Sequence, residues 1–148
     1  MCCRITDANA AHLPAMEHLE QLCFSLPWTR EQLEASLRDA QHVFLAAEDE
    51  QGKLLGYAGM MHVLDEGYVE NVAVDPACRC RGIGRALIKA LFARAEALGL
   101  SFVTLELRES NAAAEALYTA QGFVPVGRRK GYYEAPREDA ILMTKFLK

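Results

Sequence analysis

A short basic, glycine-rich segment in the middle of the chain has the residue types of an anion-binding loop. Its glycines, Gly82 and Gly84, allow a tight turn and a close approach of the backbone to a ligand. Its arginines, Arg79, Arg81 and Arg85, add positive charge around that backbone. Unpaired N–H groups at the start of a helix attract anions, so a phosphate group is the expected ligand.

The elements around this loop narrow the kind of phosphate. The loop is expected to follow a buried strand at 68–74 and to open a helix at 86–98, which Gly99 ends. Leu87 stands where a dinucleotide fold needs its third glycine, and no Gly-Lys-Ser/Thr follows as in a P-loop. The remaining Arg-x-x-Gly-x-Gly pattern resembles the pyrophosphate loop of the GNAT acetyltransferases, which hold acetyl-coenzyme A (acetyl-CoA). The alternative is that the glycines only turn a strand into a helix.

Size and composition limit the other classes of function. The 148 residues suit one domain, 1–148, and a 51% apolar content argues against disorder. A net charge of −4 disfavours direct binding of nucleic acid. The sequence has no membrane-spanning run and no signal-peptide pattern, so a cytoplasmic protein is expected. It leaves the oligomeric state open, with a monomer as the default.

The five cysteines suggest neither disulfides nor a metal site. Their number is odd, and their spacing gives no disulfide framework. A zinc site could be imagined from Cys2, Cys3, Cys78 and Cys80, but the C-x-x-C spacing is absent and two of the four lie in or beside the phosphate loop. Free thiols in a reducing compartment and no metal are therefore expected.

Apolar periodicity and turn residues predict an α/β fold with one mixed sheet and helices on both faces. Strands are expected at 3–6, 43–48, 54–63, 68–74, 102–107, 124–128 and 140–146. Helices are expected at 10–24, 29–39, 86–98 and 112–121. Asp7 is the expected cap of the first helix, and Thr29 with Gln32 forms a capping box for the second. A long basic and aromatic loop is expected at 128–136.

Further motifs make the resemblance specific and extend it over nearly the whole chain. The most specific are the Leu-Glu-x-Arg-x-Ser-Asn run ending at Asn111 and the Arg-Lys-x-Tyr-Tyr run ending at Tyr133. Others are Val72-Ala73-Val74-Asp75-Pro76, Ala116-Leu117-Tyr118 with Gly122-Phe123, Glu138-Asp139-Ala140 and Pro27-Trp28-Thr29. Together they resemble the bacterial ribosomal-protein-alanine N-acetyltransferases within GNAT.

This resemblance implies a sheet whose central strand splays away from its parallel neighbour to admit the pantetheine arm of acetyl-CoA. Backbone groups of Val72, Ala73 and Val74 would pair with that arm. Asn111 would reach the cofactor from the start of the following helix. The pyrophosphate would lie on the loop formed by Cys80, Arg81, Gly82, Ile83, Gly84 and Arg85.

Acetyl transfer to an amine needs a base for the ammonium proton, and Glu106 is the candidate. It lies mid-strand among apolar residues, where burial disfavours the charged form of a carboxylate, and the resemblance assigns the proton acceptor here. The alternative is a structural pair with Arg108, two residues along on the same strand face. Glu70, on the central strand, is a rival carboxylate of open role.

The departing thiolate benefits from an acid, and Tyr118 is the candidate because its hydroxyl can donate to the sulfur. The resemblance supports this role, and the alternative is a core tyrosine. The four histidines show no partner pattern and are interpreted as surface or packing residues. No nucleophile arrangement stands out, which favours direct transfer over an acyl-enzyme.

The residues that would bind the acetyl acceptor are harder to identify from the sequence. Trp28 at the break between the first two helices, with Arg129, Tyr132 and Tyr133, could wall a groove for a peptide; the alternative is a solvated basic loop. By resemblance, the substrate is the alanine N terminus of a small-subunit ribosomal protein. Other acceptors would be another protein N terminus or a small amine. A non-catalytic acyl-CoA-binding subunit is the alternative of a different class.

Overall fold

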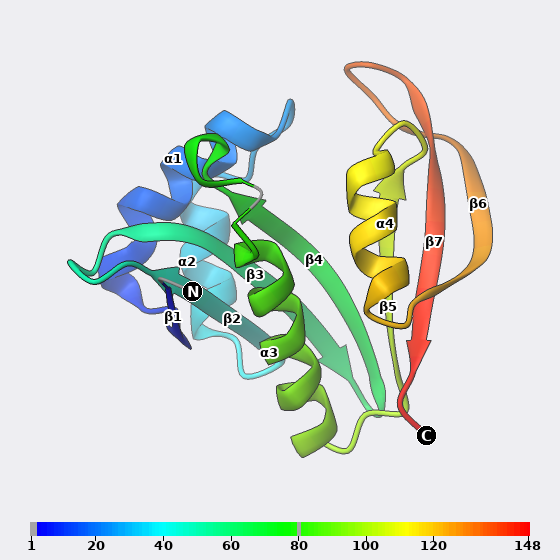
Figure 1. Cartoon of the computed structure of the whole chain (residues 1–148), viewed down its shortest axis with the longest axis horizontal. Coiled ribbons are helices and arrows are strands. Elements are labelled where there is room, and N and C mark those ends of the chain that lie inside the picture. Colours follow the sequence, from blue (N-terminus) through cyan, green and yellow to red (C-terminus); the bar gives the residue numbers. More distant parts are fainter. Residues whose placement is uncertain (1–2, 80) are drawn as a thin grey trace.

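The computed structural model describes residues 3–79 and 81–148 and shows one seven-stranded mixed sheet in the order β1-β2-β3-β4-β5-β7-β6 (Figure 1). The strands are β1 (Arg4–Asp7), β2 (His42–Glu48), β3 (Leu54–Val63), β4 (Glu66–Val74), β5 (Phe102–Arg108), β6 (Val124–Tyr133) and β7 (Glu138–Phe146). The helices are α1 (Leu13–Cys23), α2 (Arg30–Arg38), α3 (Ile83–Ala97) and α4 (Ala112–Ala120), with 3₁₀ turns at Ala10–His12 and Pro76–Cys78. The predicted α/β class and element order are confirmed.

The parallel pair β4–β5 organises the sheet, because every other neighbouring pair is antiparallel. The two strands pair only over Glu66–Tyr68 and Phe102–Thr104. Beyond this point they diverge, as the green β4 and yellow-green β5 show in Figure 1. Since β4 stays paired with β3 as far as Val74, its other edge is left open toward β5. The expected splay of the central strand is present.

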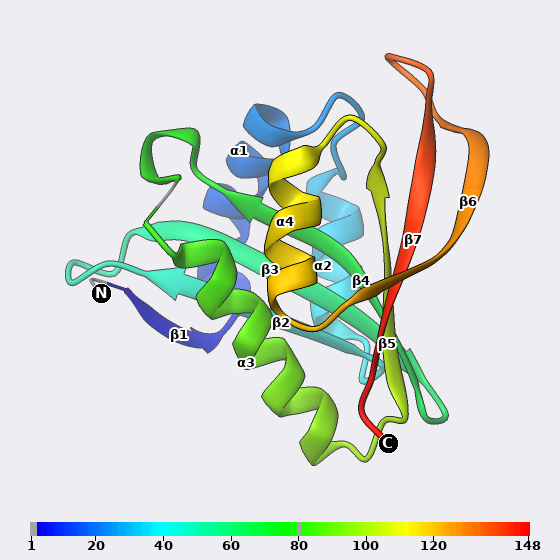
Figure 2. The same ribbon diagram turned by 45° about the vertical axis from the view of Figure 1, so that its right-hand side comes forward.

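Each face of the sheet carries its own apolar core. Helices α1 and α2 cover one face, and α3 and α4 lie over the other (Figure 2). The first core contains Leu13, Met16, Leu19, Leu33, Phe44, Leu54 and Tyr57. The second contains Leu87, Ile88, Leu91, Phe92, Val103, Leu105, Tyr118 and Phe123. These two cores fix the helix ends and strand ends that meet where β4 and β5 part.

The helix starts follow the capping chemistry, with one correction. The predicted capping box of α2 is present: the Gln32 N–H donates to Thr29 Oγ1 at 3.2 Å, and the Thr29 N–H donates to Gln32 Oε1 at 2.8 Å. Asp7 was the wrong cap for the first helix, because β1 runs on to Asp7. Asn9 accepts the Ala11 N–H instead, at 2.9 Å, and starts the 3₁₀ turn that leads into α1.

The expected loop at 128–136 is wrong for most of its length. Strand β6 continues through Arg128 and Arg129 to Tyr133 along β7, with a register shift between Arg129 and Tyr133. Asp139 on β7 accepts the Gly131 N–H at 2.8 Å across that shift. The basic residues belong to the outer strand of the sheet, where charged side chains discourage pairing with other chains.

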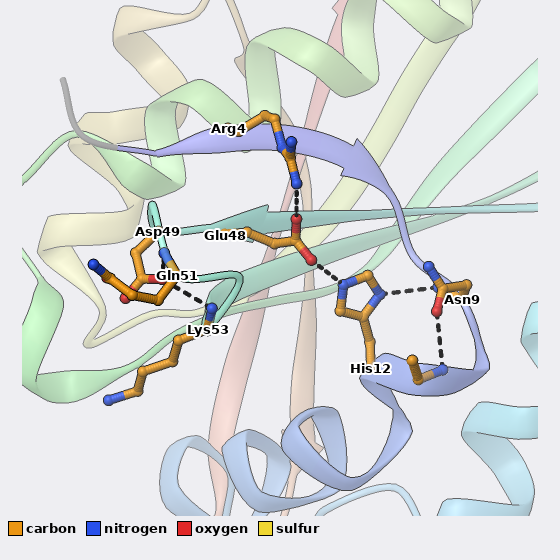
Figure 3. Close-up of polar contacts among 8 residues, drawn as sticks. Arg4, Asn9, His12, Glu48, Asp49, Gln51 and Lys53 are labelled. Atoms are coloured by element: carbon orange, nitrogen blue, oxygen red, sulfur yellow. Dashed lines mark hydrogen bonds and ion pairs between the residues drawn. The ribbon is translucent and has the colours of Figure 1, made fainter.

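The opposite edge of the sheet is held by a polar cluster on β1 and β2 (Figure 3). Glu48 on β2 contacts Arg4 and His12, each at 2.7 Å. The hydrogen bond from Arg4, followed by that from His12, lowers the pKa of the Glu48 carboxyl. His12 Nδ1 accepts the Asn9 N–H at 3.0 Å, so both ring nitrogens are engaged. This cluster ties the N-terminal segment to the sheet.

Two further findings concern the described part of the chain. Residues 3–79 and 81–148 contain no helix long and apolar enough to cross a membrane. The same residues contain no group of three or more His, Cys, Asp or Glu side chains that could hold a metal ion.

Candidate functional site

A cleft of about 390 Å³ lies where β4 and β5 part. Residues of α1, the α1–α2 connection, β4, β5, α4 and β6 line it. Both candidate catalytic residues, Glu106 on β5 and Tyr118 on α4, are among the lining residues. The polar lining that carries the following argument is Glu20, Glu70, Asn71, Glu106, Tyr118 and Tyr133.

Glu106 lines the cleft from β5, on the strand face opposite to that of the buried Leu105 and Leu107, which line the cleft as well. Its Oε1 lies 3.4 Å from Nε of Arg129 on β6. The alternative pairing with Arg108 is wrong, because the Arg108 guanidinium contacts Glu138 at 3.2 Å. The side chain of Glu106 is 27% exposed, so a substrate can reach it.

Tyr118 is buried in α4 and lines the same cleft. Its ring packs edge-on against Phe123 with 5.5 Å between centroids. Burial, with a smaller contribution from the charge of Tyr133, raises the pKa of Tyr118 to about 12. The phenol therefore keeps its proton at neutral pH and can serve as a donor. Tyr118 is thus a buried core residue, as the alternative interpretation expects, and it also lines the cleft, as a proton donor must.

The open edge of β4 carries the residues expected to meet the pantetheine arm. Val72, Ala73 and Val74 pair with β3 on one side, and the described ladder with β5 ends at Tyr68 on the other. An unpaired strand edge offers N–H and C=O groups at regular intervals, which suits the amides of an extended chain. The side chain of Val72 also lines the cleft.

The glycine-rich segment has the backbone geometry of an anion loop. Gly82 has φ of +81°, a left-handed conformation that favours glycine, and α3 begins at the next residue, Ile83. A Cβ added at Gly84 would meet side-chain atoms of Leu117 and Val74 only at 3.6 and 3.7 Å. No contact among the described residues therefore requires glycine at Gly84, and space for a ligand would explain it.

Other residues expected at the cofactor take several positions. Arg79 turns back toward the end of β4, with Nε 3.4 Å from the Val74 carbonyl oxygen. Arg81 and Arg85 flank the start of α3. Asn111 lines the cleft and caps α4 by accepting the Ala114 N–H at 3.1 Å, which leaves its amide nitrogen able to donate to a ligand. Cys80 lies outside the described residues.

The expected acceptor walls come together from both ends of the chain. Trp28, from the α1–α2 connection, and Tyr133, from the end of β6, line the cleft. Arg129 and Tyr132 reach its edge through Glu106, because Arg129 contacts that carboxylate and its guanidinium lies 5.8 Å from the Tyr132 ring. A hydrogen bond to Glu106 is also the first cause that raises the pKa of Tyr132.

Sequence reasoning missed Glu20, which is 1% exposed and lines the cleft from α1. Its Oε1 accepts the Trp28 N–H at 2.7 Å. Its Oε2 accepts from the Tyr57 hydroxyl and, at 2.9 Å, from the Asn71 amide nitrogen. The available signal was a carboxylate on the apolar stripe that Met16 begins, since buried carboxylates require partners. Glu20 thus fixes the α1–α2 connection relative to β3 and β4.

The sequence shows no partner pattern for the histidines, but the structure pairs two of them with acidic side chains. His12 belongs to the Glu48 cluster at the sheet edge, whereas His42 lies beside the cleft. His42 Nε2 is 3.1 Å from Oε1 of Glu70, and its Nδ1 is 3.3 Å from Oδ2 of Asp39. Burial raises the pKa of Glu70, and the charge of His42 opposes that shift. Glu70, whose role the sequence left open, therefore has His42 as its partner.

The cleft is suited to bind a positively charged group. Three carboxylate side chains line it, those of Glu20, Glu70 and Glu106. The arginine in its lining, Arg108, is paired with Glu138 outside it. Inside a partly buried site such carboxylates attract a cation more strongly than they do in bulk water. An ammonium group is the cation that the expected chemistry brings.

Comparison with known proteins is consistent with this geometry. The sequence profile of the Acetyltransferase (GNAT) family matches residues 13–123. The ribosomal protein bS18-alanine N-acetyltransferase of Escherichia coli (strain K12) is 37% identical over 141 residues, which cover 94% of each chain. That of Haemophilus ducreyi is 35% identical and covers 87% of this chain and 90% of the relative. The crystal structure of the Escherichia coli ribosomal-protein-S18-alanine N-acetyltransferase superposes with a TM-score of 0.91 at 34% identity, covering 99% of this chain and 94% of that one.

Proposed function

The chain belongs to the GNAT family of acetyltransferases, and from this premise we propose that it acetylates the α-amine of an N-terminal alanine on ribosomal protein bS18. The observation that carries the proposal is the meeting of Glu106 and Tyr118 in one acidic cleft at the open edge of β4. The curated relatives that are 35–37% identical over most of the chain carry this activity in their names.

Acetyl-CoA is the proposed acetyl donor, and the donor side of the cleft fits it. The open edge of β4 at Val72, Ala73 and Val74 would pair with the pantetheine amides. The N–H groups at the start of α3, from Arg81 through Gly82 and Ile83 to Gly84 and Arg85, would hold the pyrophosphate. Asn111 would donate from the start of α4, and Cys80 completes the proposed loop. Bound acetyl-CoA supplies an activated acyl group as a thioester.

Glu106 would act as the general base. Its carboxylate faces the cleft and is reachable from solvent, and it would accept a proton from the acceptor nitrogen. The contact with Arg129 keeps this carboxylate oriented in the free protein. Arg129 and the Tyr132 hydroxyl would exchange their contacts with Glu106 for contacts with the acceptor as it enters.

Tyr118 would act as the general acid toward the departing sulfur. Its pKa of about 12 keeps the hydroxyl protonated at neutral pH, and its place in the cleft lets it donate. The hydrogen bond strengthens as negative charge develops on the sulfur, so it lowers the barrier rather than tightening ground-state binding. Direct transfer needs no acyl-enzyme and no metal ion.

The acceptor would enter between the α1–α2 connection and the β6–β7 hairpin. Trp28 and Tyr133 would contact the first residues of the peptide, while the carboxylates of the cleft attract its terminal ammonium. A ribosomal protein as substrate implies a cytoplasmic enzyme whose partner is a protein N terminus. A monomer is still the predicted oligomeric state.

The test is acetyl-CoA turnover by the purified protein against peptides that differ only at their amino end. An alanine-starting bS18 peptide is compared with the same peptide carrying a blocked α-amine and with small free amines. We expect thiol release, with mass spectrometry locating one acetyl group on the α-amine of the alanine peptide. Acetylation of free amines alone would contradict the proposed acceptor, and turnover of the blocked peptide would assign the activity to lysine side chains.

A further inference from the structure

We propose that Glu70 is a second catalytic carboxylate of the cleft and that its proton leaves to the surface through His42 and Asp39. The inference rests on the proposed function, because it concerns protons that amine acetylation must remove. Neither Glu70 nor His42 was given a role by the motifs that identify the family resemblance.

The proton balance of the reaction calls for an exit. An ammonium nitrogen loses two protons when it becomes an amide, while the sulfur gains one. In the proposed sequence, Glu70 takes the first proton from the ammonium, and the neutral nitrogen then attacks the thioester carbonyl carbon. As the C–S bond breaks, Tyr118 protonates the sulfur, and the second nitrogen proton passes through Glu106 to restore the Tyr118 hydroxyl. One proton is left on Glu70 in each turnover.

The backbone places Glu70 opposite Glu106. The β4–β5 register pairs Tyr68 with Thr104, and two residues further along each strand are Glu70 and Glu106. Glu70 is also the extra residue of a β-bulge, because Gly59 pairs with Asn71 and Met60 pairs with Val69. A bulge redirects side chains locally. Two carboxylates therefore face the cleft from strands that have begun to diverge.

His42 connects Glu70 to the surface. Its Nε2 lies 3.1 Å from the Glu70 carboxylate, and its ring stacks on Phe44 with 6.1 Å between centroids. Its Nδ1 lies 3.3 Å from Asp39, whose side chain is 45% exposed at the end of α2. This Nδ1 makes no hydrogen bond within the described chain, so a small rotation of Asp39 or an entering water completes the path. An imidazole that accepts on one nitrogen and donates from the other can pass a proton along.

The groups around Glu70 favour proton exchange. Burial raises the pKa of the Glu70 carboxyl, and the charge and hydrogen bond of His42 only partly oppose that rise, so the carboxylate takes up a proton more readily than a solvated one. The other charged or titratable side chains lining the cleft are Glu20, Cys23, Glu106, Arg108, Tyr118 and Tyr133. The pKa of Tyr133 is raised to about 12 and that of Tyr118 likewise, so neither phenol competes for the first proton.

The chain offers a matched control in the pair His12–Glu48 (Figure 3). His12 is buried and contacts Glu48 at 2.7 Å, as His42 contacts Glu70. Both of its nitrogens are engaged, since Nδ1 accepts the Asn9 N–H, and Glu48 does not line the cleft. His12 therefore has the structural role that His42 would have if the proposal were wrong.

The experiment compares the wild type with three variants: His42→Ala, Glu70→Gln and His12→Ala. The substrate is whichever amine the wild type accepts. The value of kcat is measured as a function of pH, with and without added imidazole. Glu70→Gln should lower kcat at about pH 7 by around 10²-fold, the scale of losing a direct base. His42 acts through Glu70, so His42→Ala should lose about 10-fold, less than the 10²-fold scale of a direct base, and imidazole should restore it in proportion to its concentration. His12→Ala should keep kcat, with any effect confined to the melting temperature.

The outcomes separate this inference from the proposed function. Equal kcat and equal imidazole response in His42→Ala and His12→Ala would overturn the exit path while leaving the acetyltransferase intact. An unchanged kcat in Glu70→Gln would remove Glu70 from the chemistry. Wild-type protein that turns over no amine would overturn the proposed function and the exit path with it.

Discussion

The two sides of the cleft are built in different ways. The proposed donor side consists of backbone: the open edge of β4, the left-handed Gly82 and the first turn of α3, all within residues 72–85. The acceptor side consists of side chains from distant elements. Glu20 contacts Tyr57 across 37 positions of the chain and Asn71 across 51, and Arg129 reaches Glu106 from the outer strand.

This difference suggests how one fold can keep its donor and change its acceptor. A backbone site tolerates many side chains, so the glycines carry most of its sequence signal. A site made of converging side chains changes whenever one element contributes a different residue. Variants on the donor side should therefore alter acetyl-CoA affinity, and variants on the acceptor side should alter peptide KM or kcat.

The largest effect is expected for Glu106→Gln. Glutamine has the same shape but cannot take a proton, so kcat should fall by about 10²- to 10⁴-fold, the usual range for a general base. Acetyl-CoA affinity, measured by calorimetry, should stay at the wild-type value because Glu106 is not among the residues proposed to hold the cofactor. A loss confined to Glu70→Gln would show that the wrong carboxylate had been assigned as the principal base.

On the donor side, Gly84→Ala should weaken acetyl-CoA binding by about tenfold, or about 1.4 kcal/mol. The added methyl group has room in the free protein, with contacts at 3.6 and 3.7 Å, so it should clash only with a bound pyrophosphate. Alanine also favours a helix by up to about 1 kcal/mol over glycine, so the melting temperature should hold or rise. Opposite changes in stability and affinity would identify a ligand site.

Gly82 gives a less clear test than Gly84. Its φ of +81° would strain any residue with a Cβ, so Gly82→Val should lose both stability and binding. Wild-type acetyl-CoA affinity in folded Gly84→Ala would contradict the assignment of this loop to the pyrophosphate.

Tyr118→Phe tests the acid, with an expected loss of kcat of about tenfold, below the 10²-fold scale of a direct base. Acetyl-CoA affinity should change little, and the packing against Phe123 should survive because volume is conserved. Since the pKa of Tyr118 is about 12, the phenol stays protonated past the ordinary tyrosine value of about 10. Any fall of the wild-type rate below about pH 10 should therefore persist unchanged in the variant. Intact turnover would leave Tyr118 as a core residue.

The smallest effect is expected for Glu20→Gln, with a rise of about threefold in peptide KM and no change in acetyl-CoA affinity. The amide nitrogen of glutamine would face donors that the carboxylate now satisfies, which should cost about 1–3 kcal/mol of folding free energy. Glu17→Gln is the matched control, because Glu17 lies on the same helix in an exposed pair with Arg30. Equal peptide KM in the two variants would show that Glu20 does not shape the acceptor side.

Features that depend on local chemistry can be predicted from the sequence alone. The Thr29 capping box and the alternation along β5 follow from neighbouring residues, and both are confirmed. The glycine-rich segment does open a helix, but α3 begins at Ile83 and not at residue 86. The sequence also offers Glu106 and Tyr118 as candidates, and the fold places both in the lining of one cleft.

Which side chains meet in the cleft depends on the packing of distant elements and could not be predicted from the sequence. The partners of Glu20 and His42 have no local signal, because Asn71 and Glu70 lie on a strand that joins them only after β2, β3 and β4 pair. The basic run near Arg129 resembled a loop, since composition alone does not distinguish a solvated loop from an outer strand held by β7. The physical reason is the same in each case. Capping and alternation act over a few residues, whereas pairing of charges inside a cleft depends on distances that only the packed sheet sets.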